Sequence, residues 1–343
     1  MAAIRETPIL NDPAAWTGRD LQSQTDWAIA LPASVMADLK AAVASVGPLA
    51  AADAYLASLD ERPSFEAFAS TAQTIRGQLE GGRGFVLLRG LPVVDWSADE
   101  TRRALWLLGG ELGWAETQDA AGRVIHDVRD IGQKFGANDT IRYFQTSQAI
   151  EFHNDGADMF ALCCHRAGRE GGRSLLLSAV EVFNRIADRE PALAVTLQEN
   201  FYFDARGQHP NGDQCQVHPI YSYHAGQLNI ILKVAYIRSA QRFPDVPRLT
   251  KRQEAALDLL AKVLKEPDVA LEFDAKPGDV IIASNHSLLH GRTAYEDASD
   301  QDARRHMLRL WLTLPNGRPL PPHYQNTREF GPTFARREAL SSR

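Results

Sequence analysis

The chain has 343 residues, 44% hydrophobic and 23% charged, which is the balance of a globular protein that can bury a sizeable core. Its 37 Lys and Arg side chains against 43 Asp and Glu side chains give a formal net charge of −6, which argues against a generally basic, nucleic-acid-binding protein. Three cysteines are too few for a disulfide scaffold or a four-cysteine zinc site. The N-terminal stretch lacks the apolar core of a signal peptide, and no apolar run reaches the roughly 20 residues that span a bilayer. We therefore expect a cytoplasmic protein with no membrane or nucleic-acid partner, while homo-oligomer formation stays open.

The N-terminal part of the chain is predicted to be mainly helical. Residues 36–46 and 65–79 carry apolar side chains at helical spacing, and the glycine-rich stretch 81–84 then ends the second helix. Residues 85–90 form a short apolar run that is typical of a buried strand. Residues 98–112 predict another helix, with acidic residues in its first turn.

Beyond about residue 120, short apolar runs that are typical of strands dominate the sequence. These runs are residues 124–128, 159–165, 174–179, 228–237, 269–273, 279–284 and 307–314. Two helices are predicted between them, near residues 179–200 and 250–265. Many short, irregularly spaced strands favour a jelly roll (double-stranded β-helix) flanked by helices, a mixed α+β and mainly β fold. We expect residues 81–343 to form this domain and residues 1–80 to be a helical N-terminal extension packed on it.

Several common catalytic motifs are absent from the sequence. It contains no phosphate-binding loop of the type GxxxxGK[ST], no GxGxxG that opens a helix, no GxSxG and no HExxH. These absences argue against P-loop NTPases, Rossmann dehydrogenases, α/β-hydrolases and zincins. They leave enzymes whose ligands are scattered along the chain.

The segment EFHNDG contains the first candidate metal ligands. Side chains two residues apart on a strand point to the same face, so His153 and Asp155 could bind one metal ion. The segment NHSLLHGRT, which follows a predicted strand, offers His286 or His290 as a third ligand. Two histidines and a carboxylate leave other coordination positions open, and this arrangement suits non-haem Fe(II). The alternative is a polar pair on a loop and histidines that bind no metal.

The segment RRHMLRLWL, residues 304–312, combines cationic and apolar side chains. On a strand, Arg305, Arg309 and Trp311 share one face. A buried guanidinium is costly unless an anion pairs with it, and its planar fork matches a carboxylate in two hydrogen bonds. The segment therefore predicts an anion-binding site, with ion pairs to protein carboxylates or a solvent-facing strand as the alternatives.

Five blocks of the sequence, in order, resemble the taurine dioxygenase (TauD/TfdA) family of Fe(II)- and 2-oxoglutarate-dependent oxygenases. They are GFVLLRGLP (84–92), FHNDGADMFALCC (152–164), GGRSLLLSAVEVFN (171–184), KPGDVIIASNHSLLHGRTAYED (276–297) and RRHMLRLWLTLPNGRPLP (304–321). The resemblance covers roughly residues 84–322. It implies the jelly-roll fold and the cofactors of that family.

The resemblance also implies roles for individual residues. His153, Asp155 and His290 match the iron ligands of the family. Arg305 matches the arginine that binds the distal carboxylate of 2-oxoglutarate, and Ser174 matches the hydroxyl that assists it. Asp155 argues against halogenation, because the related halogenases have a small residue in its place.

The substrate pocket completes the predicted site. Arg309 stands where the taurine-oxidising member of the family binds the substrate sulfonate, whereas Ala149 replaces a polar Asn, which argues against taurine itself. We therefore expect a small anionic substrate, such as an amino acid, another carboxylate or a natural-product intermediate. Further predicted pocket residues are Tyr143, Phe144, Arg292 and Tyr223.

The expected activity is hydroxylation of an unactivated C–H bond with Fe(II), 2-oxoglutarate and O2, releasing succinate and CO2, with ascorbate as a reductant in vitro. Desaturation or ring formation with the same cofactors is one alternative. A non-catalytic jelly-roll protein that binds a small molecule is a second. A cupin-like zinc or manganese hydrolase or isomerase is a third, and Arg305 argues against it because such a site needs no cosubstrate anion.

Overall fold

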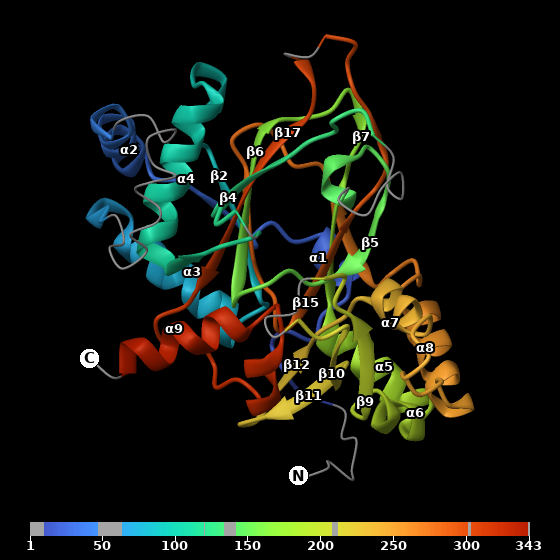
Figure 1. The fold of residues 1–343 in the computed structure, drawn as a ribbon. Coiled ribbons are helices and arrows are strands. Elements are labelled where there is room, and N and C mark those ends of the chain that lie inside the picture. Colours follow the sequence, from blue (N-terminus) through green and yellow to red (C-terminus); the bar gives the residue numbers. More distant parts are fainter. Residues whose placement is uncertain are drawn as a thin grey trace.

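Two facing β-sheets form the centre of the protein (Figure 1). The structure is a computed structural model, and it describes residues 10–46, 64–119, 121–133, 142–207, 212–300 and 303–341. The larger sheet runs in the order β1 (Ala28–Ala30), β2 (Phe85–Arg89), β14 (Val280–Ser284), β6 (Met159–Arg166), β17 (His306–Thr313) and β3 (Trp114–Glu116), and β4 (Ile125–Val128) also pairs with β17. The smaller sheet runs in the order β13 (Ala270–Phe273), β8 (Ser174–Ser178), β15 (Leu288–Arg292) and β5 (Ile150–His153). These mainly antiparallel sheets agree with the predicted jelly roll.

Alternation along the strands creates the core between the sheets. Leu87 of β2 and Ile281 of β14 point inward and meet Leu176 of β8 and Leu288 of β15 from the other sheet in one buried cluster. Their neighbours in sequence, such as Leu177 of β8, point outward into a different cluster. Each strand therefore presents every second side chain to the interior.

Helices cover the outer face of each sheet (Figure 1). On the larger sheet they are α2 (Ala33–Ser45), α3 (Ala69–Gly81) and α4 (Ala98–Leu112). On the smaller sheet they are α5 (Ala179–Arg189), α6 (Pro191–Thr196), α7 (Val234–Ala240) and α8 (Lys251–Val263). Among the described residues, no helix is long and apolar enough to cross a membrane.

Short ribbons and terminal helices complete the described structure. The ribbons pair β9 (Asn200–Asp204) with β10 (Cys215–Pro219), β11 (Tyr221–His224) with β12 (Gln227–Ile230), and β7 (Glu170–Gly171) with β16 (Tyr295–Glu296). The terminal helices are α1 (Gly18–Gln22) and α9 (Gly331–Ser341). Short 3-10 segments lie at Glu66–Phe68, Val93–Asp95, Tyr143–Gln145 and Pro322–Asn326.

Two sequence predictions of single elements were wrong. The apolar run 228–237 is not one strand, because β12 ends at Ile230 and α7 begins at Val234. A short apolar run fits a buried helix as well as a strand, so its pattern could not decide between them. The expected helix 179–200 is two helices that meet at Glu190, because Pro191 disfavours a helical residue before it.

The N-terminal part is not a purely helical extension. Helices α2 and α3 are present, but β1 pairs in parallel with β2 and extends the larger sheet. Trp16 lies between the sheets, 5.4 Å from the Phe85 ring between centroids, and its Nε1–H donates to the Arg83 carbonyl at 2.8 Å. The described N-terminal residues therefore contribute to the central core. The domain boundary near residue 80 stays a prediction.

We predict that Ser97→Ala lowers the free energy of unfolding by about 1 kcal/mol, because Ser97 caps α4. Its hydroxyl accepts from the Glu100 backbone N–H at 3.2 Å, and the Glu100 carboxylate accepts from the Ser97 N–H at 2.8 Å. Urea denaturation measures the change. Ser45→Ala at the C-terminal end of α2 is the control, and an equal loss in both variants would contradict the capping role.

Candidate metal centre

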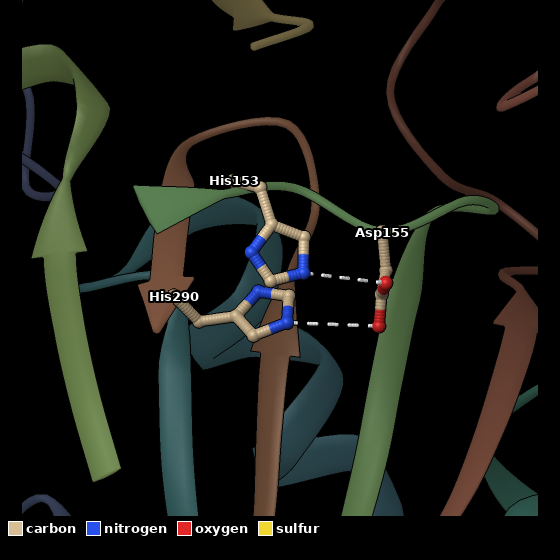
Figure 2. Close-up of side chains that lie close together, drawn as sticks. All are labelled: His153, Asp155 and His290. Carbon is tan, nitrogen blue, oxygen red and sulfur yellow. Dashed lines mark ion pairs between the residues drawn. The ribbon is translucent and has the colours of Figure 1, made fainter. Parts of the chain in front are cut away.

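Three potential metal ligands converge where the edge strand β5 of the smaller sheet ends (Figure 2). His153 ends β5 and is the direct cross-strand partner of His290 on β15. Asp155 follows His153, and its two oxygens lie 3.8 Å from His153 Nε2 and 3.6 Å from His290 Nε2. One ligand atom from each side chain fits within 4.8 Å of the others, so the cluster could hold one metal ion.

The strand argument used for His153 and Asp155 was wrong for Asp155. Strand β5 ends at His153, and β6 begins only at Met159, so Asp155 lies in the connecting loop. Pairing between β5 and β15 brings the two histidines together, and their ring centroids lie 4.3 Å apart. The carboxylate reaches them from the loop, and contacts outside the smaller sheet must hold it there.

The histidines are arranged for binding a cation through Nε2. His153 Nδ1–H donates to the Glu151 carbonyl at 2.9 Å, because a carbonyl can only accept, and this leaves the Nε2 lone pair free. Burial, followed by the charge of His153, lowers the pKa of His290 to about 3. Burial also lowers the pKa of His153. Both rings are therefore neutral at physiological pH, as metal ligands must be.

Asp155 is held as a carboxylate by strand β17. Arg309 Nη1 donates to both of its oxygens, at 3.1 and 3.0 Å, and Trp311 Nε1–H donates to Oδ2 at 3.0 Å. Burial alone would raise the pKa of Asp155, but the charge of Arg309, with the hydrogen bond from Trp311, opposes it, and that pKa lies below its usual range. The donor set of two neutral imidazoles and one carboxylate fits non-haem Fe(II).

A buried asparagine clamps the loop that carries Asp155. Asn285 Oδ1 accepts from the Asp155 N–H at 3.2 Å, and Nδ2 donates to the Gly156 and Ala157 carbonyls at 2.7 and 3.2 Å. Ala157 has φ 62°, a left-handed conformation that is unfavourable for a residue with a side chain. The Ala157 N–H donates to the Glu329 carbonyl at 2.8 Å. Side-chain and backbone contacts together hold this turn.

His286, the other candidate for the third ligand, lies behind the clamp. It is fully buried, and its Nε2 lies 2.9 Å from Asp158 Oδ1. Asp158 also accepts from the Leu314 N–H and from Arg337 of α9, each at 2.7 Å. His286 is therefore paired with a structural carboxylate, away from the cluster of His153 and His290.

Arg305, directly before β17, has unused hydrogen-bonding capacity. It is 4% exposed, its guanidinium carbon lies 5.1 Å from the centre of the Tyr295 ring, and Nη1 has no hydrogen-bond partner in the part of the chain that the structure describes. Burial lowers its pKa. An unpaired N–H in a buried guanidinium is costly, so this group fits an anion that enters the site. The distal carboxylate of 2-oxoglutarate has the charge and the planar shape that it requires.

Ser174 and Arg292 face the same interior. They are direct partners across β8 and β15, and Arg292 lies two residues beyond His290 on one face of its strand. Both side chains are buried, at 6% and 5% exposure. The structure thus brings Ser174 and Arg292 to the interior face that also carries His290.

The remaining predicted pocket residues differ in position. The Phe144 ring lies 5.0 Å from the Arg309 guanidinium carbon, so it lines the site. Tyr143, beside it in a 3-10 turn, is 37% exposed. Tyr223 is 41% exposed on the β11–β12 ribbon, which does not pair with the strands that carry the metal ligands. The roles of these residues toward a substrate stay predictions.

Sequence reasoning missed Asn285, Tyr295, Trp311 and Gln118 as contributors to the site. Gln118 Oε1 accepts from Arg309 Nε at 2.8 Å, across 191 residues of chain. Only Trp311 could have been found, because it shares the strand face of Arg309. The other contacts depend on distant segments that have no common motif.

The sequence matches the family described as "Taurine catabolism dioxygenase TauD, TfdA family" over residues 58–311. It is 31% identical to "FR-33289 synthase" of Streptomyces rubellomurinus over 250 residues, 71% of this chain and 73% of that one. It is 25% identical to "Taurine hydroxylase-like protein SAT17" of Stachybotrys chartarum over 321 residues, 90% of this chain and 80% of that one. Both relatives align over most of their length.

A solved structure of asparagine oxygenase with Fe(II), (2S,3S)-3-hydroxyasparagine and succinate superposes with a TM-score of 0.63. The superposition covers 84% of this chain and 94% of the asparagine oxygenase chain. The sequence identity is 18%, so this similarity shows a shared fold only. The family match spans most of the sequence, so the chain belongs to the TauD/TfdA family. It is a dioxygenase that depends on Fe(II) and 2-oxoglutarate.

We predict that Asn285→Ala weakens Fe(II) binding roughly 10- to 100-fold, the usual effect of removing a group that orients a metal ligand. Anaerobic titration of the metal-free protein measures the affinity. Asn184→Ala is the matched control. Asn184, on α5, is also buried, and its side chain forms hydrogen bonds of 2.8 and 2.9 Å with the backbone of Leu10. If both variants bound Fe(II) like the unchanged protein, the clamp would not orient Asp155.

Proposed function

We propose that this protein hydroxylates a C–H bond of a small anionic molecule. The observation that carries the proposal is that the cluster of His153, Asp155 and His290 occurs together with the buried guanidinium of Arg305, which forms no ion pair with a carboxylate among the described residues. Neither feature alone specifies this chemistry, because many sites bind metals and many arginines bind anions. Together they supply a metal position and a dicarboxylate position in one interior.

The residues have separate tasks in this proposal. His153, Asp155 and His290 would hold Fe(II), and Arg305 with Ser174 would hold the distal carboxylate of 2-oxoglutarate. When bound, these groups use O2 to convert R–H and 2-oxoglutarate to R–OH, succinate and CO2. The protein's share is orientation and exclusion of water. The Phe160 ring, 4.3 Å from the His290 ring between centroids, contributes an apolar wall on one side.

Cationic side chains near the metal ligands support an anionic substrate. Arg309 uses Nε and Nη1 within the protein, whereas Nη2 makes no hydrogen bond among the described residues. Lys233 pairs with Glu329, and its charge contributes to lowering the pKa of both His153 and His290. Arg309 thus has one nitrogen left with which to bind a substrate anion, in line with the role expected from the sequence.

Desaturation and ring formation use the same residues and differ from hydroxylation only after the hydrogen atom has been abstracted. A protein that only binds a small molecule would need no separate cosubstrate site, so the unpaired Arg305 favours an enzyme. The mass of the product distinguishes the oxidative outcomes: hydroxylation adds one oxygen atom, and desaturation removes two hydrogen atoms. The cytoplasmic location stays a prediction.

We predict that anaerobic addition of Fe(II) and 2-oxoglutarate produces a weak visible charge-transfer band, and that Arg305→Gln weakens 2-oxoglutarate binding by at least tenfold. Loss of a charge-assisted hydrogen-bond pair gives this magnitude. Arg304→Gln is the control, because the neighbouring Arg304 Nε donates to the Ala298 carbonyl at 3.3 Å, outside the site. A folded, unchanged protein that showed no band would count against the proposed function.

We also predict that a panel of small anions contains one that stimulates succinate release, and that Arg309→Lys raises the KM for this anion about tenfold or more. A lysine keeps the charge but loses the forked geometry that serves Asp155 and a substrate together. Fe(II) affinity must be measured in parallel, because Arg309 also holds Asp155. An unchanged KM in a variant that still binds Fe(II) would remove Arg309 from substrate recognition.

A further inference from the structure

Two buried arginines contact the same aromatic ring, that of Tyr295. The guanidinium carbons of Arg292 and Arg305 lie 4.6 and 5.1 Å from the centre of the Tyr295 ring. The two residues are 5% and 4% exposed. Neither forms an ion pair with a carboxylate in the part of the chain that the structure describes, whereas Arg309 pairs with Asp155. Both guanidinium groups are thus buried against one ring without a carboxylate at ion-pair distance, although the charge of Asp297 acts on both.

Arg292 has unused donors, as Arg305 does. Its Nη2 donates to the backbone carbonyls of Thr146 and Gln148, which attaches the turn that carries Phe144. Its Nε and Nη1 are buried and have no hydrogen-bond partner among the described residues. One nitrogen is therefore enough for the structural contact, and two nitrogens of the same guanidinium are left.

The direction of Arg292 places those donors in the interior. His290 and Arg292 are two residues apart on β15 and so share a face, and Ser174 is the direct partner of Arg292 on β8. The residue already matched to the distal carboxylate, Ser174, is therefore the cross-strand neighbour of Arg292. Arg292 and Ser174 therefore lie at the same level of the sheet, two residues along from His290.

Backbone contacts fix the other arginine. A Cβ on Gly172 would lie 3.2 Å from Arg305 Nε, and Gly172 has φ +71°, which favours glycine. The Arg305 backbone N–H donates to Asp297 Oδ1 at 2.7 Å. Arg305 therefore has little freedom to move away from Arg292, and the charge of Arg305, after burial, is the next cause that lowers the pKa of Arg292 to about 10.

We propose that Arg292 is a second guanidinium for the distal carboxylate of 2-oxoglutarate and that it makes the site selective for a dicarboxylic oxo acid. This inference rests on the proposed function of the site. One carboxylate has lone pairs for two guanidinium groups and a hydroxyl, so it can satisfy the free donors of Arg292, Arg305 and Ser174 together. The bound anion also compensates the repulsion between the two arginines.

The competing explanation is that Arg292 only holds the turn at Thr146. In that case its loss would disturb the whole site, and every oxo acid would bind more weakly. If Arg292 binds the distal carboxylate, its loss affects only oxo acids that have this group. The pair 2-oxoglutarate and 2-oxopentanoate separates the two cases, because they share the metal-binding end and differ in the terminal carboxylate.

The experiment is anaerobic titration of the Fe(II)-loaded, full-length protein with each oxo acid, followed through the visible band. For Arg292→Gln we expect the Kd of 2-oxoglutarate to rise about 10- to 100-fold, while the Kd of 2-oxopentanoate and the affinity for Fe(II) change less than about threefold. Arg173→Gln is the matched control: this neighbouring arginine is 42% exposed and pairs with Glu272 at 2.9 Å, and we expect no change.

Each other outcome is decisive. Equal weakening of both oxo acids, or a lower Fe(II) affinity, would assign Arg292 to holding the turn, and an unchanged Kd for 2-oxoglutarate would also overturn the inference. If Arg292→Gln does not fold, Arg292→Lys replaces it, with the same selective loss expected because one ammonium cannot serve the turn and the carboxylate together. If the unchanged protein gives no band, the proposed function fails and not only the role of Arg292.

Discussion

The ion pair between Arg309 and Asp155 determines whether the metal centre exists, because Asp155 is the one ligand that no strand holds. His153 and His290 are placed by strand pairing, which fixes their Cα positions through backbone hydrogen bonds. Asp155 stands in a loop, and its carboxylate is directed by Arg309 and Trp311 from the opposite sheet. The centre therefore depends on the two sheets keeping their separation, which is the task of the apolar cluster between them.

The same interior has an excess of positive charge. Asp155 compensates Arg309, but Arg292 and Arg305 form no ion pair with a carboxylate among the described residues. A metal cation would add to this excess, and under the proposed function a bound dicarboxylate would reduce it. Charge balance would thus couple metal and anion: the metal requires Asp155 to be ionised, and an anion would compensate the arginines. The net charge of −6 of the whole chain does not reveal this local excess of positive charge.

Local patterns predicted those elements whose signal lies within the element itself. Helix α4 was expected over residues 98–112 and is found at Ala98–Leu112, because its acidic first turn and apolar face are encoded within the helix itself. The strand pattern of β17 predicted that Arg309 and Trp311 share a face, and both bind Asp155. Contacts between segments that are far apart in the sequence could not be predicted from local patterns. Strand β1 joins the larger sheet through pairing with β2 across almost 60 residues. Its three-residue sequence, AIA, is too short to show a periodicity that would predict this pairing. Asn285 likewise acts across 130 residues.

The clamp behind the metal loop extends this dependence to the C-terminus. Asp158 ends the loop and is buried with no exposed side-chain surface, where an unpaired carboxylate would be costly. It is compensated by Arg337 of α9 and by hydrogen bonds from His286 and the Leu314 backbone. Glu329, just before α9, supplies the carbonyl that holds Ala157 in its left-handed conformation. The last described helix and the segment before it thus fix the loop from behind, while β17 fixes the carboxylate from the front. A metal ligand must be held within about 0.5 Å, and a loop residue reaches that precision only when both sides are constrained.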